Sequence, residues 1–436
     1  MAAHYLTGAA SQLLTGPIAP ALALAGWDRV DITPRTPIAL AGFAHRAGLS
    51  PANAVVSPLQ LRTMALKQGP RTAVIVVADL LWWGDDTTAR IRTLVEKYGI
   101  RGDQVLLHAT HQHSGPQTSD RFTPGLGLPD PAWVDWLCTQ TAASICRAIE
   151  GATSPVRLAQ AETPYLLGVD RRSAREVNPV QPLDQRLRVI TLRHDDRLLA
   201  TLFHHACHPV THGGNAITAE FTGSAMSHLE ASGRTGIALY LQGCCGNINP
   251  DRYLDRTFQT GDQAAIDIAG HALADQVMSL SDKDFTPITV DLATGQSMIN
   301  VPTAPAPDRA ELRRLTEAGE PKTAGWAHRL LASPERRTGP TTVLVSRLRL
   351  GAELTLVGVS AEVTSPYADK VRAHFDNRVL PLGYTNGMTG YLVTARQLAE
   401  GGYESVDAPY WFGMRGPLLP EAESVITDAL CTAVDR

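Results

Sequence analysis

Apolar residues along the chain alternate between strand-like runs and helical spacing. The β-branched run at residues 73–79 predicts a buried strand. Between residues 91 and 98 the apolar positions recur at spacings of three and four, which predicts an amphipathic helix. Residues 105–107 form the next predicted strand. A strand, a helix and a strand in this order imply a parallel pair joined by a right-handed crossover.

Two hairpins are predicted further along the chain, at residues 186–205 and 342–360. A strand at 237–242 follows a helix near 223–232, and Ser365-Pro366 provides a good N-terminus for another helix. Together these elements indicate an α/β fold with a mixed β-sheet and flanking helices.

The segment at residues 301–340 differs from the rest because it contains six prolines and several arginines. A short charged helix is predicted at 308–318, between two of these prolines. We expect the segment to be a surface excursion or lid, inserted into a single domain that spans residues 1–436. With Trp326 and its arginines, it is expected to shape the pocket.

Composition and charge narrow the class of protein. The 436 residues include 39 Lys+Arg and 43 Asp+Glu, a formal net charge of −4, and 44% of them are hydrophobic. These values are ordinary for a soluble enzyme with a large core, and they lack the basic footprint of a nucleic-acid binder. The longest apolar run, at 73–83, is too short for a membrane span. We expect a small-molecule substrate, and the oligomeric state is not readable from the pattern.

The N-terminus and the cysteines bear on location. Residues 1–6 carry no basic n-region, and Pro17 and Pro20 interrupt the nearby apolar stretch, so no secretory signal is predicted. Six cysteines in so long a chain are too sparse for a disulfide framework. A cytoplasmic location is therefore expected.

Residues with catalytic or metal-binding chemistry follow the predicted strands. Seven of the fourteen histidines lie in two loops, after the strands at 105–107 and 198–205. In open α/β sheets, ligands bind at the carboxyl ends of strands, so this clustering favours a metal site at that edge. The candidates in these and the next two loops are His111, His113, His208, Asn249 and Glu362.

Each candidate also has a plainer interpretation. His111 and His113, two apart on an extended chain, could face one ion, or they could be an ordinary hydrogen-bonded pair. Glu362 follows an apolar strand, where a carboxylate is costly unless it is paired, bound to a cation or solvated. Cys207 and the cysteines at 244–245 could bind a soft ion, but tight packing is favoured because no Cys-x-x-Cys spacing occurs.

Taken in order, six landmarks resemble the neutral ceramidase family, specifically its catalytic N-terminal domain and its shorter bacterial relatives. They span nearly the whole chain, and the run at 110–116 (Thr-His-Gln-His-Ser-Gly-Pro) is quite specific. The landmarks are Asp31-Ile-Thr-Pro34 with Gly42-Phe-Ala-His-Arg46, Ala109-Thr-His-Gln-His-Ser-Gly-Pro116, Cys207-His-Pro209 with residues 215–223, residues 242–250, Ser360-Ala-Glu362, and Gly390-Tyr-Leu-Val-Thr394 with Gly401-Gly-Tyr-Glu404.

The resemblance implies a zinc-dependent amidase and a set of site residues. His113 matches the second histidine beside the metal, and Tyr403 the tyrosine that faces the scissile carbonyl. Arg171 matches a substrate-side arginine, with Arg172 as the alternative alignment. The implied zinc ligands are His111, His208, Glu362 and Tyr391.

The chemistry that follows is hydrolysis of an amide by attack of zinc-bound water. Two imidazoles, a carboxylate and a phenolate suit zinc better than magnesium or copper. His113 would move protons, while Tyr403 and Arg171 would donate hydrogen bonds to the oxyanion.

The chain also departs from the family pattern. Asn249 stands where the family has a serine, and asparagine cannot act as a serine-type nucleophile, so a substrate-contacting role is expected for it. We also expect no C-terminal β-domain. These departures favour a linear amide that is smaller or more polar than ceramide. Hydrolysis of an ester or lactone, ring closure by acyl transfer within one molecule, and ligand binding without catalysis remain alternatives.

Overall fold

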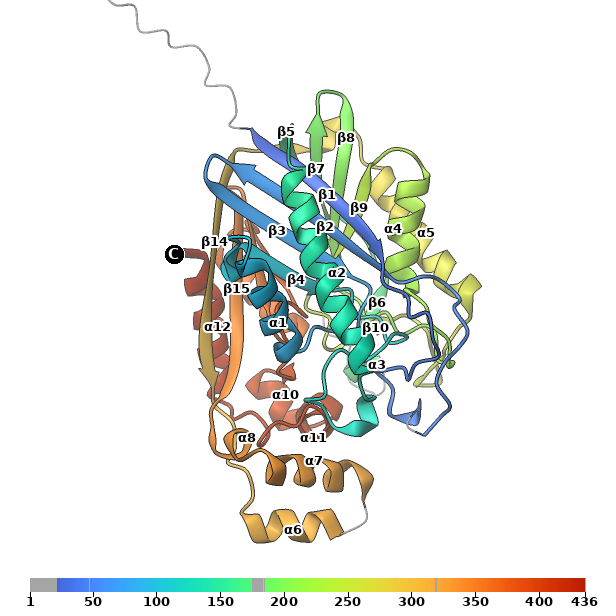
Figure 1. Cartoon of the computed structure of the whole chain (residues 1–436), viewed down its shortest axis with the longest axis vertical. Coiled ribbons are helices and arrows are strands. Elements are labelled where there is room, and N and C mark those ends of the chain that lie inside the picture. The colour runs from blue at the N-terminus through green and yellow to red at the C-terminus, as the bar shows by residue number, and fades with distance from the viewer. Residues whose placement is uncertain (1–21, 47, 175–182, 184, 318–319, 436) are drawn as a thin grey trace, which may run out of the picture.

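Nine strands form the main sheet of the part of the chain that the structure, a computed structural model, describes, which is residues 22–46, 48–174, 183, 185–317 and 320–435 (Figure 1). The strand order is β4-β3-β2-β1-β5-β7-β8-β9, and β13 pairs with β5. The strands are β1 (Ala23–Asp31), β2 (Gln60–Gln68), β3 (Arg71–Ala78), β4 (Val105–Ala109), β5 (Ser154–Pro164), β7 (Arg186–His194), β8 (Arg197–His205), β9 (Ile237–Gln242) and β13 (Thr286–Ile288).

The main sheet is mixed, as predicted. β3 pairs with β4 in parallel across helix α1 (Asp85–Glu96), and β8 pairs with β9 in parallel across helix α4 (Glu220–Ala231), while the other pairs are antiparallel. Ile91 and Val95 of α1 are buried, which confirms the helix that the apolar spacing predicted. α2 (Pro131–Glu150) packs on β1 and β2, and α5 (Gln263–Met278) packs on α4 (Figure 1).

A second sheet contains the predicted hairpin of β15 (Thr341–Gly351) and β16 (Leu354–Val359). β14 (Val290–Val301) flanks it on one side and β18 (Val379–Leu382) on the other, the latter in parallel with β16 across α9 (Ser365–His374). α12 (Ala422–Asp435) packs on β14 and β15. The two sheets meet where a backbone bridge joins His108 to Thr385. This junction brings the carboxyl ends of β4 and β18 together.

Three short strand pairs lie beyond the ends of the long strands. β6 (Gly168–Asp170) pairs with β10 (Ile248–Pro250), β17 (Glu362–Val363) with β19 (Tyr391–Leu392), and β11 (Tyr253–Leu254) with β12 (Thr257–Phe258). The first two pairs carry or adjoin most of the candidate site residues. Local strand pairing therefore fixes the backbone positions of these residues. The remaining helical segments near them are α3 (Arg171–Ala174), α10 (Ala395–Glu400), a π-helical turn (Tyr403–Asp407) and α11 (Ala408–Trp411).

The proline-rich segment leaves the second sheet between β14 and β15 and forms three helices, where one was predicted. They are α6 (Arg309–Glu317), α7 (Pro321–Ala332) and α8 (Pro334–Thr338), and they project from one end of the molecule (Figure 1). Pro321 and Pro334 occupy the first helical positions, where proline costs no hydrogen bond, so they begin helices instead of interrupting the chain. Trp326, 4% exposed, donates a hydrogen bond from Nε1 to the carbonyl of Met414 at 2.6 Å and so anchors α7 to the body.

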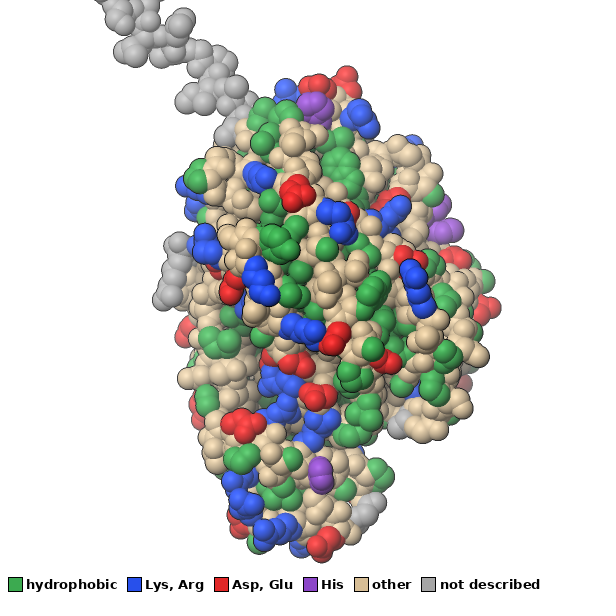
Figure 2. Space-filling model, viewed as in Figure 1, with side chains coloured by type: hydrophobic (Ala, Val, Ile, Leu, Met, Phe, Trp, Pro, Cys, Tyr) green, Lys and Arg blue, Asp and Glu red, His purple; other side chains and the backbone are tan. Residues whose placement is uncertain are grey.

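Side chains of both charges are interspersed over much of the molecular face in Figure 2. Cys138, Cys146, Cys207, Cys244 and Cys245 are free thiols. Within the described ranges, every helix is too short or too polar to cross a bilayer. Residues 1–21, on which the expectation of a cytoplasmic location rests, lie outside the described residues.

Candidate active site

Three imidazoles and one carboxylate converge beyond the carboxyl ends of the strands. The coordinating nitrogens of His111, His113 and His208 all lie within 4.8 Å of one another, and this group could hold a metal ion. The Nε2 atoms of His111 and His208 each lie 3.4 Å from Oε2 of Glu362. The Nε2 atoms of His111 and His113 are 3.2 Å apart. The structure therefore confirms that the histidine loops form a candidate metal site at this edge.

The backbone around His111 differs from the prediction. We expected His111 and His113 on an extended chain, but β4 ends at Ala109 and His111 has a φ of 67°, in the left-handed region. The His111 amide donates to the carbonyl of Leu80 at 2.9 Å, which stabilises this turn. The two imidazoles meet because the chain bends, and not because alternate residues of a strand share a face.

Backbone carbonyls fix the orientation of all three imidazoles. Nδ1 of His111 lies 2.8 Å from the carbonyl of Leu81, and Nδ1 of His208 lies 2.7 Å from that of Cys245. Nδ1 of His113 lies 3.2 Å from the carbonyl of Gly42. A carbonyl can only accept a hydrogen bond, so we assign the proton to Nδ1 in each ring. In its neutral form, each imidazole then turns a lone pair on Nε2 toward the centre of the cluster.

The cluster contains buried hydrogen-bond acceptors that have no donor within the described part of the chain. Burial lowers the pKa of His208 to about 4, although Glu362 opposes this shift, so the ring is neutral at pH 7. Burial alone would raise the pKa of Glu362, but His111 and His208 outweigh it and hold that pKa well below its usual range. Among the described residues, no hydrogen-bond donor reaches Oε2 of Glu362 or Nε2 of His208. A cation would satisfy these buried acceptors.

The spacing of the acceptors suits a small ion. Ligand atoms about 2.0–2.1 Å from a tetrahedral zinc ion lie about 3.4 Å apart. The contacts of Glu362 with His111 and His208 have this length, at 3.4 Å each. Imidazole nitrogens with a carboxylate oxygen are donors that zinc accepts readily. The residues present therefore fit the metal that the resemblance implies.

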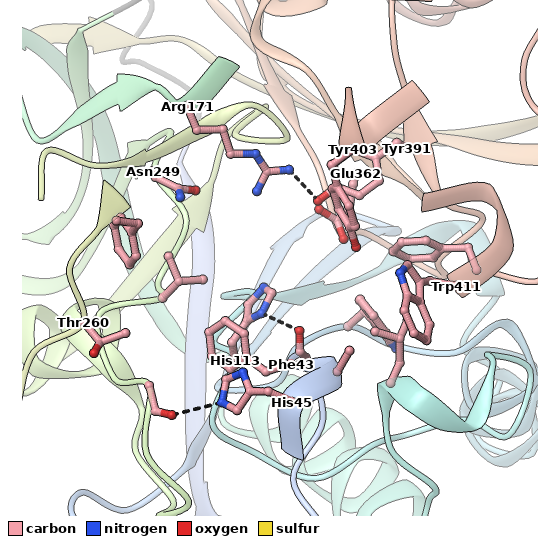
Figure 3. Close-up of a pocket in the computed structure, with 18 residues that line it drawn as sticks. Phe43, His45, His113, Arg171, Asn249, Thr260, Glu362, Tyr391, Tyr403 and Trp411 are labelled. Atoms are coloured by element: carbon pink, nitrogen blue, oxygen red, sulfur yellow. Dashed lines mark hydrogen bonds between the residues drawn. The ribbon is translucent and has the colours of Figure 1, made fainter. Parts of the chain in front are cut away.

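Tyr391 is held beside Glu362 by the backbone. The two residues are register partners in the parallel pair of β17 and β19, and Figure 3 shows their side chains together on one side of the pocket. Nη2 of Arg171 donates a hydrogen bond to the Tyr391 hydroxyl at 3.0 Å. Burial raises the pKa of Tyr391 well above its usual range, although Arg171 opposes this shift.

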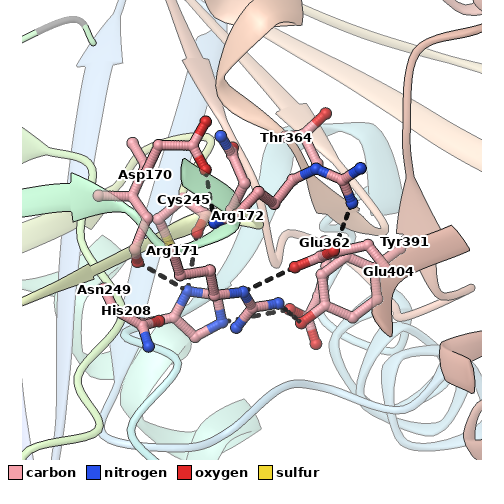
Figure 4. A network of polar contacts seen from close by, with 12 residues as sticks. Asp170, Arg171, Arg172, His208, Cys245, Asn249, Glu362, Thr364, Tyr391 and Glu404 are labelled. Carbon is pink, nitrogen blue, oxygen red and sulfur yellow. Dashed lines mark hydrogen bonds and ion pairs between the residues drawn. The ribbon is translucent and has the colours of Figure 1, made fainter. Parts of the chain in front are cut away.

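Arg171 and Arg172 have different surroundings, which separates the two alternatives. Arg171 lines the pocket, together with Asn249 on the same side (Figure 3). Arg172 does not line this pocket. Its Nη1 donates to Glu404 at 2.7 Å and its Nη2 to the carbonyl of Gly401 at 2.8 Å (Figure 4). Of the two, Arg171 is therefore the one placed to contact a substrate.

The Gly-Gly-Tyr-Glu landmark has a local structural reason. Gly401 and Gly402 have φ values of 72° and 90°, and a Cβ on Gly402 would lie 2.9 Å from Nη1 of Arg172. Glycine lets the chain turn left-handed there and leaves room for the arginine. The π-helical turn that follows places Tyr403 in the pocket wall, with its ring centroid 5.8 Å from that of Tyr391. π-Helical turns are frequent at functional sites.

Two residues near the site had no predicted role. Tyr384 stacks on His111 with ring centroids 3.8 Å apart, and its hydroxyl lies 3.1 Å from the sulfur of Cys245. Glu404 binds both arginines. Cys207, Cys244 and Cys245 are buried, and the metal-binding group found among the described residues contains no cysteine, which agrees with a packing role.

The pocket in front of the cluster has a volume of about 290 Å³. Asn249 lines it, donates from Nδ2 to the hydroxyl of Tyr253 at 3.0 Å, and has no partner for Oδ1 among the described residues. Phe43, Ala44 and Trp411 line both this pocket and a second cavity of about 670 Å³. That second cavity is mainly apolar, and its lining includes Leu40, Leu49, Pro124, Leu128, and Pro321 and Gly325 of the inserted segment.

The chain shares its fold with solved ceramidases. Neutral ceramidase from Pseudomonas aeruginosa matches it with a TM-score of 0.75 and 17% identity, over 95% of this chain and 74% of that chain. A ceramidase in complex with C2 matches with a TM-score of 0.74 and 17% identity, over 94% and 74% of the two chains. No protein-family model and no curated protein matches the sequence. The predicted likeness to neutral ceramidase is confirmed at the level of the fold.

Proposed function

We propose that this chain is a zinc-dependent amidohydrolase that cleaves a linear amide of the N-acyl amine type. The observation that carries the proposal is the convergence of three imidazole lone pairs and the Glu362 carboxylate on one point, with Arg171 beside it. The ceramidase fold supports an amide as the reacting group, because ceramidases cleave an amide bond.

We assign the metal to His111, His208, Glu362 and Tyr391. When bound there, zinc would polarise the carbonyl and lower the pKa of a water molecule to about 7. His113 is neutral at pH 7, because burial and the neighbouring histidines lower its pKa well below the usual value. Its Nε2 can therefore accept a proton from the attacking water and pass it to the leaving amine.

Two hydrogen-bond donors flank the position where the carbonyl oxygen of the substrate amide would bind. Tyr403 and Arg171 both line the pocket, and burial raises the pKa of Tyr403, so its hydroxyl remains protonated at pH 7. Each would donate a hydrogen bond to the oxygen as negative charge develops, a contribution worth about 2.7–4 kcal/mol per donor. Neither group needs to move a proton for this role.

The cavities suggest the kind of substrate. At about 290 Å³ the catalytic pocket is small for a ligand site, which supports a substrate smaller than ceramide. The neighbouring cavity of about 670 Å³ is mainly apolar, so we propose that an apolar group on the substrate extends past Phe43 and Trp411 into it. Within the expectation of a smaller or more polar amide, the apolar lining favours the smaller one. Asn249 would contact the substrate on the Arg171 side.

Metal content and turnover of the purified chain test the proposal. We expect about one zinc per chain in the wild type and in His228→Ala, a histidine of α4 outside the cluster, and none in His111→Ala or Glu362→Ala. Tyr403→Phe should keep the metal and lose about 10²–10³ in kcat. The substrates are short N-acyl alkylamines with the matching esters and lactones. Turnover of the esters but not of the amides would show that the chain is an esterase and not an amidase. Full activity after chelation would overturn the proposed metal dependence.

A further inference from the structure

Glu404 is a buried carboxylate held between two arginines. It is 3% exposed; its Oε1 accepts a hydrogen bond from Nε of Arg171 and its Oε2 one from Nη1 of Arg172, each at 2.7 Å (Figure 4). Burial alone would raise the pKa of Glu404, but the two guanidinium groups outweigh it and lower that pKa below its usual value. Charge-assisted contacts of this length are strong and directional.

The nitrogens of Arg171 and Arg172 that do not contact Glu404 have different surroundings. Arg172 is anchored away from the pocket, by the carbonyl of Gly401 at 2.8 Å and by its own amide, which donates to Asp170 at 2.9 Å. Nη2 of Arg171 donates to the Tyr391 hydroxyl, while its Nη1 has no partner among the described residues and belongs to a side chain that lines the pocket. Nε and Nη2 of Arg171 are therefore occupied by Glu404 and Tyr391, and Nη1 is available to a ligand.

We infer that Glu404 is a positioning residue that sets the Arg171 guanidinium so that Nη2 reaches Tyr391 and Nη1 faces the substrate. The inference rests on the proposed function for its catalytic consequence. Arg171 and Arg172 are adjacent in sequence and carry like charges, so the carboxylate between them removes a repulsion that would turn Arg171 away. A planar guanidinium held at Nε and Nη2 has no freedom left to rotate, which keeps Nη1 in place for the developing oxyanion.

A double-mutant cycle separates this role from a merely structural one. In otherwise wild-type protein, Glu404→Gln should lower kcat about 10-fold with little change in KM, because the neutral amide holds Nε of Arg171 less firmly. In the Arg171→Ala background the same substitution should cost nothing further. Glu400→Gln is the matched control, since Glu400 contacts Arg172 but makes no contact with Arg171, and should leave kcat unchanged. Equal losses in both backgrounds, or no loss in either, would overturn the inference.

A crystal structure of the Glu404→Gln variant gives a readout that needs no turnover. We expect the guanidinium of Arg171 to leave the Tyr391 hydroxyl, while the zinc content stays at the wild-type level. If Arg171 still lies about 3.0 Å from that hydroxyl, Glu404 does not position it. This measurement decides the role of Glu404 even if no amide proves to be a substrate, so failure of the inference and failure of the proposed function are distinguishable.

Discussion

The Nε2 atom of His208 lies 3.4 Å from Oε2 of Glu362, and neither atom has a proton to share with the other. The proton of His208 is on Nδ1, which donates to the carbonyl of Cys245, and Glu362 is ionised. Two acceptors facing each other in a buried site repel. A bound cation converts this repulsion into attraction, so metal and fold stability are coupled.

The coupling predicts a metal-dependent melting temperature. At a free zinc concentration 100 times Kd, the free energy of unfolding should rise by about 2.7 kcal/mol over chelated protein. His208→Ala should abolish the rise, and His228→Ala, in α4 and outside the cluster, should retain it. Thermal melts with and without chelator measure both. If the melting temperature of the wild type is the same with and without zinc, the assignment of the metal site is contradicted.

His113 offers a test of which imidazoles hold the metal and which move protons. It belongs to the cluster, with its Nε2 3.2 Å from that of His111. Among the described residues, however, His111 and His208 pair with Glu362 and His113 does not. His113→Ala should therefore keep about one zinc per chain and lose about 10²–10⁴ in kcat. Metal analysis alongside steady-state kinetics checks this. Loss of zinc in the variant would make His113 a ligand instead.

The apolar cavity predicts a dependence on chain length. Leu49 and Leu128 line it and are 52% and 54% exposed, so glutamine at either position should not disturb folding. For the wild type, kcat/KM should rise about fourfold for each methylene that enters the cavity. Leu49→Gln and Leu128→Gln should flatten this rise, whereas Ile268→Gln, at a 73% exposed position on α5, should not. Identical chain-length profiles in all four proteins would exclude the cavity as a substrate site.

Glu220 predicts how stability changes with pH. Burial raises its pKa to about 7, although backbone amides including that of His212 oppose the shift, and its usual value is 4.5. Between pH 4.5 and 7 the folded chain therefore binds more protons at this site than the unfolded chain does. Its contribution to stability is full below pH 4.5 and is lost as pH rises toward 7.

Glu220→Gln removes this titration. From pH 5 to pH 8, the free energy of unfolding of the wild type should fall by about 2–3 kcal/mol more than that of the variant. Urea titrations at the two pH values measure the difference, and the comparison cancels the other titrating groups. Parallel pH dependence in the two proteins would show that Glu220 is not held in its protonated form.

The parts of the fold that were predictable are those with a local pattern. The strand now seen as β3 and the helix α1 follow from β-branched runs and apolar spacing within a few residues. The positions of His208 and Glu362 follow from the rule that ligands gather at the carboxyl ends of strands. The prediction missed helix α7 of the inserted segment because Pro321 was taken as a helix breaker. Proline is in fact accepted at the first position of a helix, which is where Pro321 lies.

The parts that were not predictable depend on contacts between distant residues. Glu404 lies 233 positions from Arg171 along the chain, and no periodicity links them. Whether Arg171 or Arg172 enters the pocket depends on how β6 pairs with β10, which sets the direction of the short helix that follows. The turn at His111 depends on the carbonyl of Leu80, another contact outside its own strand.

The direct pairing of Glu362 with Tyr391 has a consequence for enzyme engineering. One backbone ladder sets both side chains, so their position relative to each other depends on the register of β17 and β19. A one-residue slip would turn one of the two side chains to the opposite face and dismantle the cluster. Within a fixed register, the two positions form a replaceable pair at which the charge and softness of the metal's surroundings can be redesigned together.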